Sequence, residues 1–197
     1  MQRFDSPDEA RPAHPRLALR AAFHNAGLGL RRGVVDLAPT SDSWARAFVG
    51  VHRVLRDTAP ASVVAIDHIG STSVPGLDAK PVLDIGVAVR HGASPAPLDD
   101  WLTGLGMLLR GDANEVRPDR MYGFELEPMI RLANVHVVEA DSEDRRRYLA
   151  FRDHLRAHPA DRDAYAALKH DLAVRHPLDR LAYIDGKSAF ITARRGE

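Results

Sequence analysis

The chain has 197 residues, 45% of them hydrophobic, and its 27 basic and 27 acidic residues give a net charge of zero. This length suits one compact domain with a buried core, and the neutral balance argues against a nucleic-acid partner. The absence of cysteine excludes disulfides and cysteine-based metal centres, and we expect no redox cofactor. Neither a membrane-length apolar run nor a signal peptide is evident, so the sequence predicts a cytoplasmic protein without a membrane partner.

The first two thirds of the chain read as an N-terminal extension followed by an α/β core. Residues 1–32 begin rich in Pro, Arg and Ala, and we expect them to form an extension or mobile arm with a short helix over 16–26. The core is expected over residues 33–140. Hydrophobic periodicity predicts helices at 43–57 and 97–109, and strands at 33–37, 62–69, 82–89, 121–126 and 134–139.

A helical C-terminal part is expected over residues 141–197. Ser142 is a predicted N-cap with acidic residues in the following turn. His158-Pro159 should end that helix, and further helices are predicted at 160–175 and 179–195. The predicted fold class is therefore α/β (α+β), with a mixed sheet flanked by helices and a helical C-terminal part.

Polar residues collect between the two apolar strands at 62–69 and 82–89. His68 is followed by Gly70 and by three hydroxyl residues at 71–73, which are Ser71, Thr72 and Ser73. Glycine allows a close backbone approach, and successive N–H groups can form an anion-binding nest. Lys80 adds an ammonium and Asp84 a carboxylate. This set fits a site for phosphate and Mg²⁺, and a tight hairpin with capping hydroxyls is the alternative.

Lysine is rare in this chain, because only Lys80, Lys169 and Lys187 are lysines among the 27 basic residues. A coding bias towards arginine explains the ratio. Under such a bias, a position that stays lysine can be one that needs a compact ammonium group.

The stretch HIGSTSVPGLDAKPVLDI, residues 68–85, resembles the diagnostic segment of the GrpB family. A Gly-Ser after a strand, with an Asp about a dozen residues later, is also similar to the polymerase-β-like nucleotidyltransferase superfamily. The likeness covers about residues 33–195 as a single domain. It includes Trp44, the 134–139 strand with His136, and the motifs around Phe151, Tyr165 and Tyr183-Ile184-Asp185-Gly186-Lys187.

The resemblance implies a nucleotidyltransferase-like core with a nucleotide or phosphorylated ligand. Some family members are fused to dephospho-CoA kinase, which suggests a link to CoA metabolism. Such transferases hold two metal ions with carboxylates two residues apart. Here Asp84 has the first place and Gly86 the second. We therefore expect Asp84 and His136 to hold one divalent metal, Mg²⁺ or Mn²⁺ rather than Zn²⁺.

Several further residues have two readings. His68 binds the ligand or is a buried histidine that orients the loop. Arg152, Tyr183 and Lys187 bind phosphate at the cleft or form a polar network between helices. Glu125 and Glu127 are candidate substitutes for the missing carboxylate, although Pro128 suggests an exposed edge.

Two functions follow from these expectations. The first is metal-dependent nucleotidyl transfer with Asp84, His136 and Lys80 as catalytic residues. His68, Gly70, Ser71, Thr72, Ser73, Lys80, Arg152, Tyr183 and Lys187 would then bind the phosphorylated substrate. The alternative is an inactive module that senses a nucleotide or a CoA-like ligand, which Gly86 favours.

Overall fold

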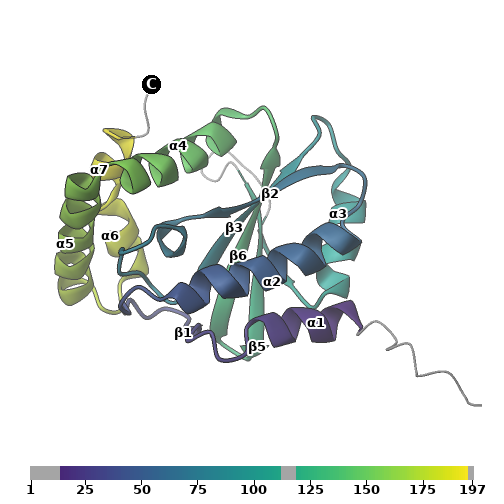
Figure 1. Ribbon diagram of the computed structural model, residues 1–197, viewed down its shortest axis with the longest axis horizontal. Helices are drawn as coiled ribbons and strands as arrows, with labels where there is room; N and C mark the ends of the chain where they lie inside the picture. Colours follow the sequence, from purple (N-terminus) through teal and green to yellow (C-terminus); the bar gives the residue numbers. More distant parts are fainter. Residues whose placement is uncertain (1–13, 112–118, 195–197) are drawn as a thin grey trace, which may run out of the picture.

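A mixed β-sheet forms the centre of the molecule (Figure 1), whose computed structural model describes residues 14–111 and 119–194. Within these residues the sheet order is β2-β3-β6-β5-β4, and β1 pairs with the start of β6. β3 and β6 run parallel, and the other neighbours are antiparallel. The strands are β1 (Leu30–Arg31), β2 (Val63–Ile69), β3 (Leu83–Val89), β4 (Leu108–Gly111), β5 (Arg120–Glu127) and β6 (Ile130–Glu139).

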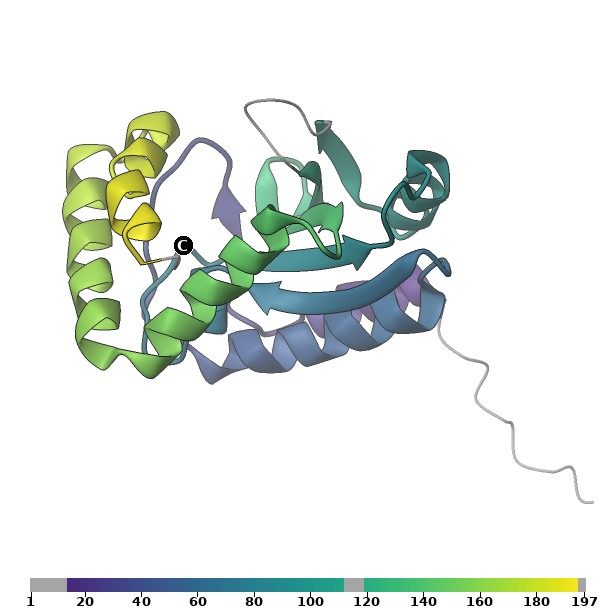
Figure 2. The ribbon, with the colours of Figure 1, turned by 90° about the horizontal axis from the view of Figure 1, so that it is seen from above.

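The helices cover the sheet unequally. α1 and α2 lie on one face, α4 crosses the other, and α5, α6 and α7 stand together at one end of the sheet (Figures 1 and 2). None of the described helices is long and apolar enough to cross a membrane. Their bounds are α1 (Pro15–Ala22), α2 (Asp42–Thr58), α3 (Pro95–Gly104), α4 (Glu143–Ala157), α5 (Pro159–Arg175), α6 (Arg180–Asp185) and α7 (Ser188–Thr192). The predicted mixed α/β class is confirmed.

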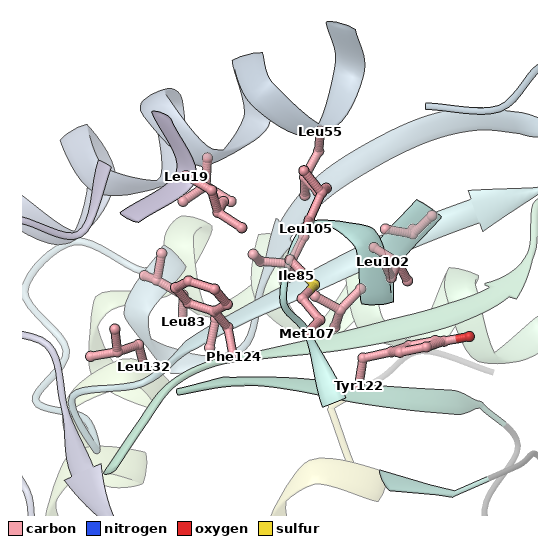
Figure 3. Close-up of a cluster of buried hydrophobic side chains, with 14 of the residues drawn as sticks. Leu19, Leu55, Leu83, Ile85, Leu102, Leu105, Met107, Tyr122, Phe124 and Leu132 are labelled. Carbon is pink, nitrogen blue, oxygen red and sulfur yellow. The ribbon is translucent and has the colours of Figure 1, made fainter. Parts of the chain in front are cut away.

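The main hydrophobic core fills the space between the sheet and α1, α2 and α3 (Figure 3). Alternate residues of β3, namely Leu83, Ile85 and Val87, are fully buried in it, as the period of two in a strand requires. α2 supplies the stripe that its helical spacing predicts, with Trp44 and Leu55 buried against these strands.

The opposite face of β3 carries Asp84 and Gly86. In the register of the sheet, Asp84 lies beside Asn134 of β6 and Gly86 lies beside His136. α4 is attached to this face by an ion pair of 3.2 Å between Arg145 and Asp67 of β2. The less apolar face of β3 is therefore the one that brings polar side chains together.

Two predicted elements of the core are wrong. Residues 33–37 form no strand, and the short strand β1 instead precedes them and pairs with Arg131 and Ile130. The predicted helix at 97–109 ends at Gly104, and Leu108–Gly111 is a strand. Gly106 has a φ of +89°, which ends the helical conformation and turns the chain into β4.

The ends of the chain also differ from expectation. The predicted final helix at 179–195 is two short helices, α6 and α7, separated at Gly186, and residue 195 lies outside the described residues. Of the predicted extension, residues 1–13 lie outside the described residues. Leu19 and Phe23 are buried in the main core, so from α1 onward this segment packs on the domain and is no mobile arm. The boundaries at 33 and 140 stay predictions.

Candidate functional site

The loop between β2 and β3 is shaped by a close approach of Asp84 to Gly70. Gly70 has a φ of +68°, and a Cβ at this position would lie 2.5 Å from Oδ2 of Asp84. Only glycine satisfies both conditions. A turn of 3₁₀-helix over Ser71–Ser73 follows directly. Gly70 thus lets the carboxylate lie against the loop, and it does not line the cleft described below.

His68 lies on the other face of the sheet from Asp84. Its ring stacks on Phe48 of α2 with 4.5 Å between ring centroids, and its Nε2 is 3.0 Å from Oγ1 of Thr72. Burial lowers the pKa of His68 to about 4, so the ring is neutral near pH 7. The geometry matches the reading in which His68 orients the loop.

Two arginines of α4 hydrogen-bond to backbone carbonyls at the start of the β2–β3 loop. Arg152 donates to the carbonyl of His68 at 3.1 Å, and Arg156 donates to the carbonyl of Ser73 at 2.7 Å. The hydroxyl of Ser73 donates to the carbonyl of Gly70 at 2.5 Å. Neither Arg152 nor Ser73 lines the cleft, so both fix the shape of the loop.

In front of this loop is a cleft of about 710 Å³ between the sheet, the β1 turn and the C-terminal helices. Asp84, Asn134 and His136 line it from β3 and β6, and Ser71 and Thr72 line it from the loop. Among the described residues, Asp84 is the single carboxylate of the lining. The cations of the lining are Arg31, Arg32, Lys80, Arg110, Arg131, Lys169, Arg180 and Lys187. The cleft is therefore strongly suited to anions.

A hydrogen-bonded row of side chains crosses the floor of the cleft. Arg131 donates to Oδ1 of Asn134 at 2.5 Å, and the Asn134 amide donates to Oδ1 of Asp84 at 2.8 Å. The same Asp84 oxygen is 3.6 Å from Nε2 of His136. On the other side of the ring, Nδ1 of His136 is hydrogen-bonded to Asp119, a carboxylate that is 4% exposed. His136 thus stands between two carboxylates.

The charges of this row are interdependent. Desolvation opposes the charged form of His136, but the hydrogen bonds and charges of Asp119 and Asp84 outweigh it and raise the pKa of His136 to about 9. Desolvation would likewise raise the pKa of Asp84, yet His136, Asn134 and Lys80 hold it below its usual value. In the ligand-free protein near pH 7, an imidazolium therefore lies beside an ionised carboxylate.

The three lysines of the chain line this cleft, Lys80 and Lys187 beside Tyr183 and Lys169 beside Tyr165. The Nζ atoms of Lys80 and Lys187 lie 5.2 and 4.4 Å from the centre of the Tyr183 ring. Lys169 is buried and donates to the carbonyl of Asp78. Burial, followed by the mutual repulsion of these amines, lowers the pKa of Lys169 and of Lys187 to about 7. An anionic ligand would relieve that repulsion.

The two glutamates considered as substitute carboxylates do not line the cleft. Glu125 is engaged by Arg110 and Arg131 and accepts from the backbone N–H of Met129. Glu127 is exposed at the end of β5. Glu125 therefore holds arginines in place along the cleft.

The structure brings together most of the predicted site residues and adds others. Asp84, His136, Lys80, Ser71, Thr72, Tyr183 and Lys187 line one cleft, whereas His68, Gly70, Ser73 and Arg152 support the loop. Asn134 was missed, although its position two residues before His136 places it on the same strand face. Asp119 and the cleft arginines carry no local signal in the sequence.

The donors at Asp84 and His136 fit a single divalent metal ion. Both donor atoms face the same point of the cleft, and Asp119 occupies the other nitrogen of His136, as carboxylates commonly do behind metal-bound histidines. The residues do not fit a pair of metals, because Gly86 supplies no side chain. An exposed group, His91, Glu139 and Asp141, also has metal-compatible spacing.

Fold and site together define an α/β protein with a cleft, lined by lysines and arginines, between a mixed sheet and a C-terminal helical part. The family model described as GrpB protein matches residues 34–195, and the chain belongs to this family. The crystal structure of the conserved protein GrpB from Enterococcus faecalis is similar, with a TM-score of 0.71 and 30% identity. The match covers 81% of this chain and 94% of that one.

Curated relatives extend the likeness to other bacteria. A UPF0157 protein of Pseudomonas aeruginosa is 38% identical over 158 residues, and the UPF0157 protein YqkA of Bacillus subtilis is 34% identical over 157 residues. Each match covers 80% of this chain. The chain spans 64% of the first relative and 45% of the second, so it corresponds to a part of these longer proteins.

Proposed function

We propose that the cleft binds a phosphorylated small molecule, and a nucleotide in particular. The observation that carries this proposal is the charge of the lining, in which eight cationic side chains surround Asp84 as the one carboxylate of the described residues. Phosphate groups are the common biological ligands that match so dense a positive charge.

Several of these cations are available to a ligand. Lys80, Lys187 and Arg180 form no ion pair with another residue in the described parts of the chain. Lys80 and Lys187 are also partly desolvated against Tyr183, which strengthens their attraction for an anion. In this arrangement the lysines bind the phosphates, and the hydroxyls of Ser71 and Thr72 complete their hydrogen bonds.

The remaining lining suits the organic part of such a ligand. Apolar side chains line the same cleft, namely Leu30, Val34, Val82, Met121, Met129 and Ile184. The volume of about 710 Å³ lies within the range of pockets that hold cofactor-sized molecules. A nucleotide offers both the charge and the flat apolar ring that this lining would accommodate.

A second candidate function is metal-dependent nucleotidyl transfer to a small molecule or a protein hydroxyl. The separation of 3.6 Å between Asp84 and His136 favours it, because a metal held there would lie beside the phosphate-binding lysines. Bound metal would supply Lewis-acid activation of a phosphate. The chain's own residues would orient that phosphate and neutralise its charge. Gly86 favours the alternative, a binding module without catalysis.

Calorimetric titration tests the binding proposal, with ATP and CoA as probes in EDTA and in Mn²⁺. We expect Lys80→Gln and Lys187→Gln each to weaken binding about tenfold or more, as loss of a charge-assisted contact does. Arg46→Gln, on the exposed side of α2, is the matched control and should bind as the wild type does. Equal affinity in all four proteins, or no binding by the wild type, would contradict the proposal.

Transfer activity separates the two candidates. Release of pyrophosphate from ATP with matching formation of an AMP–acceptor ester, dependent on metal and lost in Asp84→Asn, would establish nucleotidyl transfer. Binding without any turnover, across hydroxyl acceptors and metals, would leave the ligand-binding module as the function.

A further inference from the structure

We propose that Asp84 and His136 together form a mononuclear site for a divalent transition metal, Mn²⁺ or Zn²⁺ in preference to Mg²⁺, and that Asp119 is its positioning residue. The inference rests on the proposed function, since the open coordination positions of the ion would face the phosphates of the cleft ligand.

The first argument is the geometry of the two donors. Nε2 of His136 and Oδ1 of Asp84 are 3.6 Å apart, which is longer than a good hydrogen bond. Ligand atoms that bind one ion at about 2.0–2.2 Å lie about 3.0–3.6 Å from each other. The two side chains come from adjacent parallel strands, and the sheet therefore fixes their separation.

The second argument is the support behind each donor. Asp119 is buried and is hydrogen-bonded to Nδ1 of His136, which leaves Nε2 as the atom that faces the cleft. Asn134 holds the carboxylate of Asp84 at 2.8 Å, and Gly70 leaves room for its second oxygen. The orientation of both donors is thus set before any ion binds.

The third argument concerns the identity of the metal. Mg²⁺ prefers oxygen ligands in octahedral geometry, whereas imidazole suits Zn²⁺ and related ions and carboxylate suits Mn²⁺. Gly86, two residues after Asp84 on the same strand face, supplies no side chain, and His136 of the neighbouring strand lies directly beside it. The donor pair is thus one imidazole nitrogen and one carboxylate, which shifts the preference away from Mg²⁺ and departs from the expectation that placed Mg²⁺ ahead of Zn²⁺.

The surface group of His91, Glu139 and Asp141 is the natural control. Glu139 is the last residue of β6, three residues after His136, and it already accepts from His91 at 2.8 Å and from the Gly92 N–H at 3.0 Å. These side chains are exposed or half-buried, and none of them lines the cleft described above. His91→Ala removes one donor from this group and leaves the cleft intact.

The test is direct titration of the metal-free protein with Mn²⁺, Zn²⁺ and Mg²⁺ alone, measured by calorimetry and by the NMR signals of the His136 ring. We expect one equivalent of Mn²⁺ to broaden those signals, and Mg²⁺ to bind about tenfold or more weakly than Mn²⁺. Asp84→Asn and His136→Gln should abolish the site. Asp119→Asn should weaken it about 10–100-fold, and His91→Ala should leave it unchanged.

Any of three results would overturn the inference: no metal binding by the wild type, equal affinity for Mg²⁺, or a site that is lost in His91→Ala. The NMR readout uses the wild-type protein, so it remains valid if one of the variants fails to fold. ATP binding in EDTA reports on the proposed function alone. Failure of the metal site with ATP binding retained would therefore be distinguished from failure of both.

Discussion

The two faces of β3 differ in what their side chains do. Leu83, Ile85 and Val87 are fully buried against the helices on one face. Asp84 on the other face is one-third exposed and lines the cleft. Alternate residues of one seven-residue strand therefore contribute to the core and to the proposed binding cleft. The contrast predicts that substitutions on the two faces will separate the free energy of unfolding from ligand affinity.

Ile85→Ala should give the largest loss of stability. Removing a fully buried Ile side chain leaves a cavity and costs about 2–5 kcal/mol. Chemical denaturation measures this loss, and ATP affinity at low temperature should stay near the wild-type value. A large loss of affinity in the folded variant would show that the two faces are not independent.

His68 is an exception to this contrast, because its polar imidazole ring lies on the apolar face of the sheet, against Phe48 of α2. Its pKa is about 4 when folded and about 6.5 when unfolded, so the unfolded chain binds the additional proton between these values. Stability should therefore fall as the pH drops from 6.5 to 4, by at most about 3 kcal/mol from this residue. His68→Gln should show a shallower dependence in denaturation experiments from pH 7 to 4, and an identical slope would contradict this account.

Gly70→Ala tests how the loop depends on its close approach to Asp84. Its φ of +68° and ψ of −174° lie in a region essentially restricted to glycine, which costs another residue about 1–3 kcal/mol, and the new methyl group would displace the Asp84 carboxylate. We expect lower stability together with weaker Mn²⁺ binding. Gly27→Ala has a similar φ of +63° with open space around the new Cβ, and Gly27 does not line the cleft, so it should lose stability without changing Mn²⁺ binding.

Lys187→Met tests the polar cleft, and of these variants we expect it to change the free energy of unfolding least. ATP affinity should fall about tenfold, or about 1.4 kcal/mol. Since the pKa of Lys187 is about 7 in the folded protein and its usual value is 10.5, the unfolded chain binds more protons between these pH values. Wild-type stability should thus rise with pH in this window relative to Lys187→Met. Denaturation at pH 7 and 9 checks the sign.

Much of the fold could be predicted from the sequence because its signals are local. The helix over Asp42–Thr58, the strands at 63–69 and 83–89, and the N-cap at Ser142 agree with their predictions. The errors arose where tertiary pairing decided the conformation. The 33–37 segment has strand composition but finds no partner strand, whereas Leu30–Arg31 pairs with β6.

The residues of the candidate site could likewise be predicted only where the signal was local in the sequence. The loop motif and period-two alternation pointed to Asp84, Ser71 and Lys80, and all of them line the cleft. His68 was ambiguous because a histidine next to a glycine-rich loop has the same sequence whichever face of the sheet it occupies. Only its stacking on Phe48 resolves the ambiguity.

The sequence by itself determined the alternation of β3, the glycine at position 70, the missing carboxylate at position 86 and the rarity of lysine. Each of these is a property of neighbouring residues or of composition. The tertiary structure alone decided that Lys80 and Lys187 lie over the ring of Tyr183, that Asp119 lies behind His136, and that arginines from β1, β4, β6 and α6 share a cleft. These contacts join residues that are far apart in the chain, and local sequence patterns do not predict such long-range contacts.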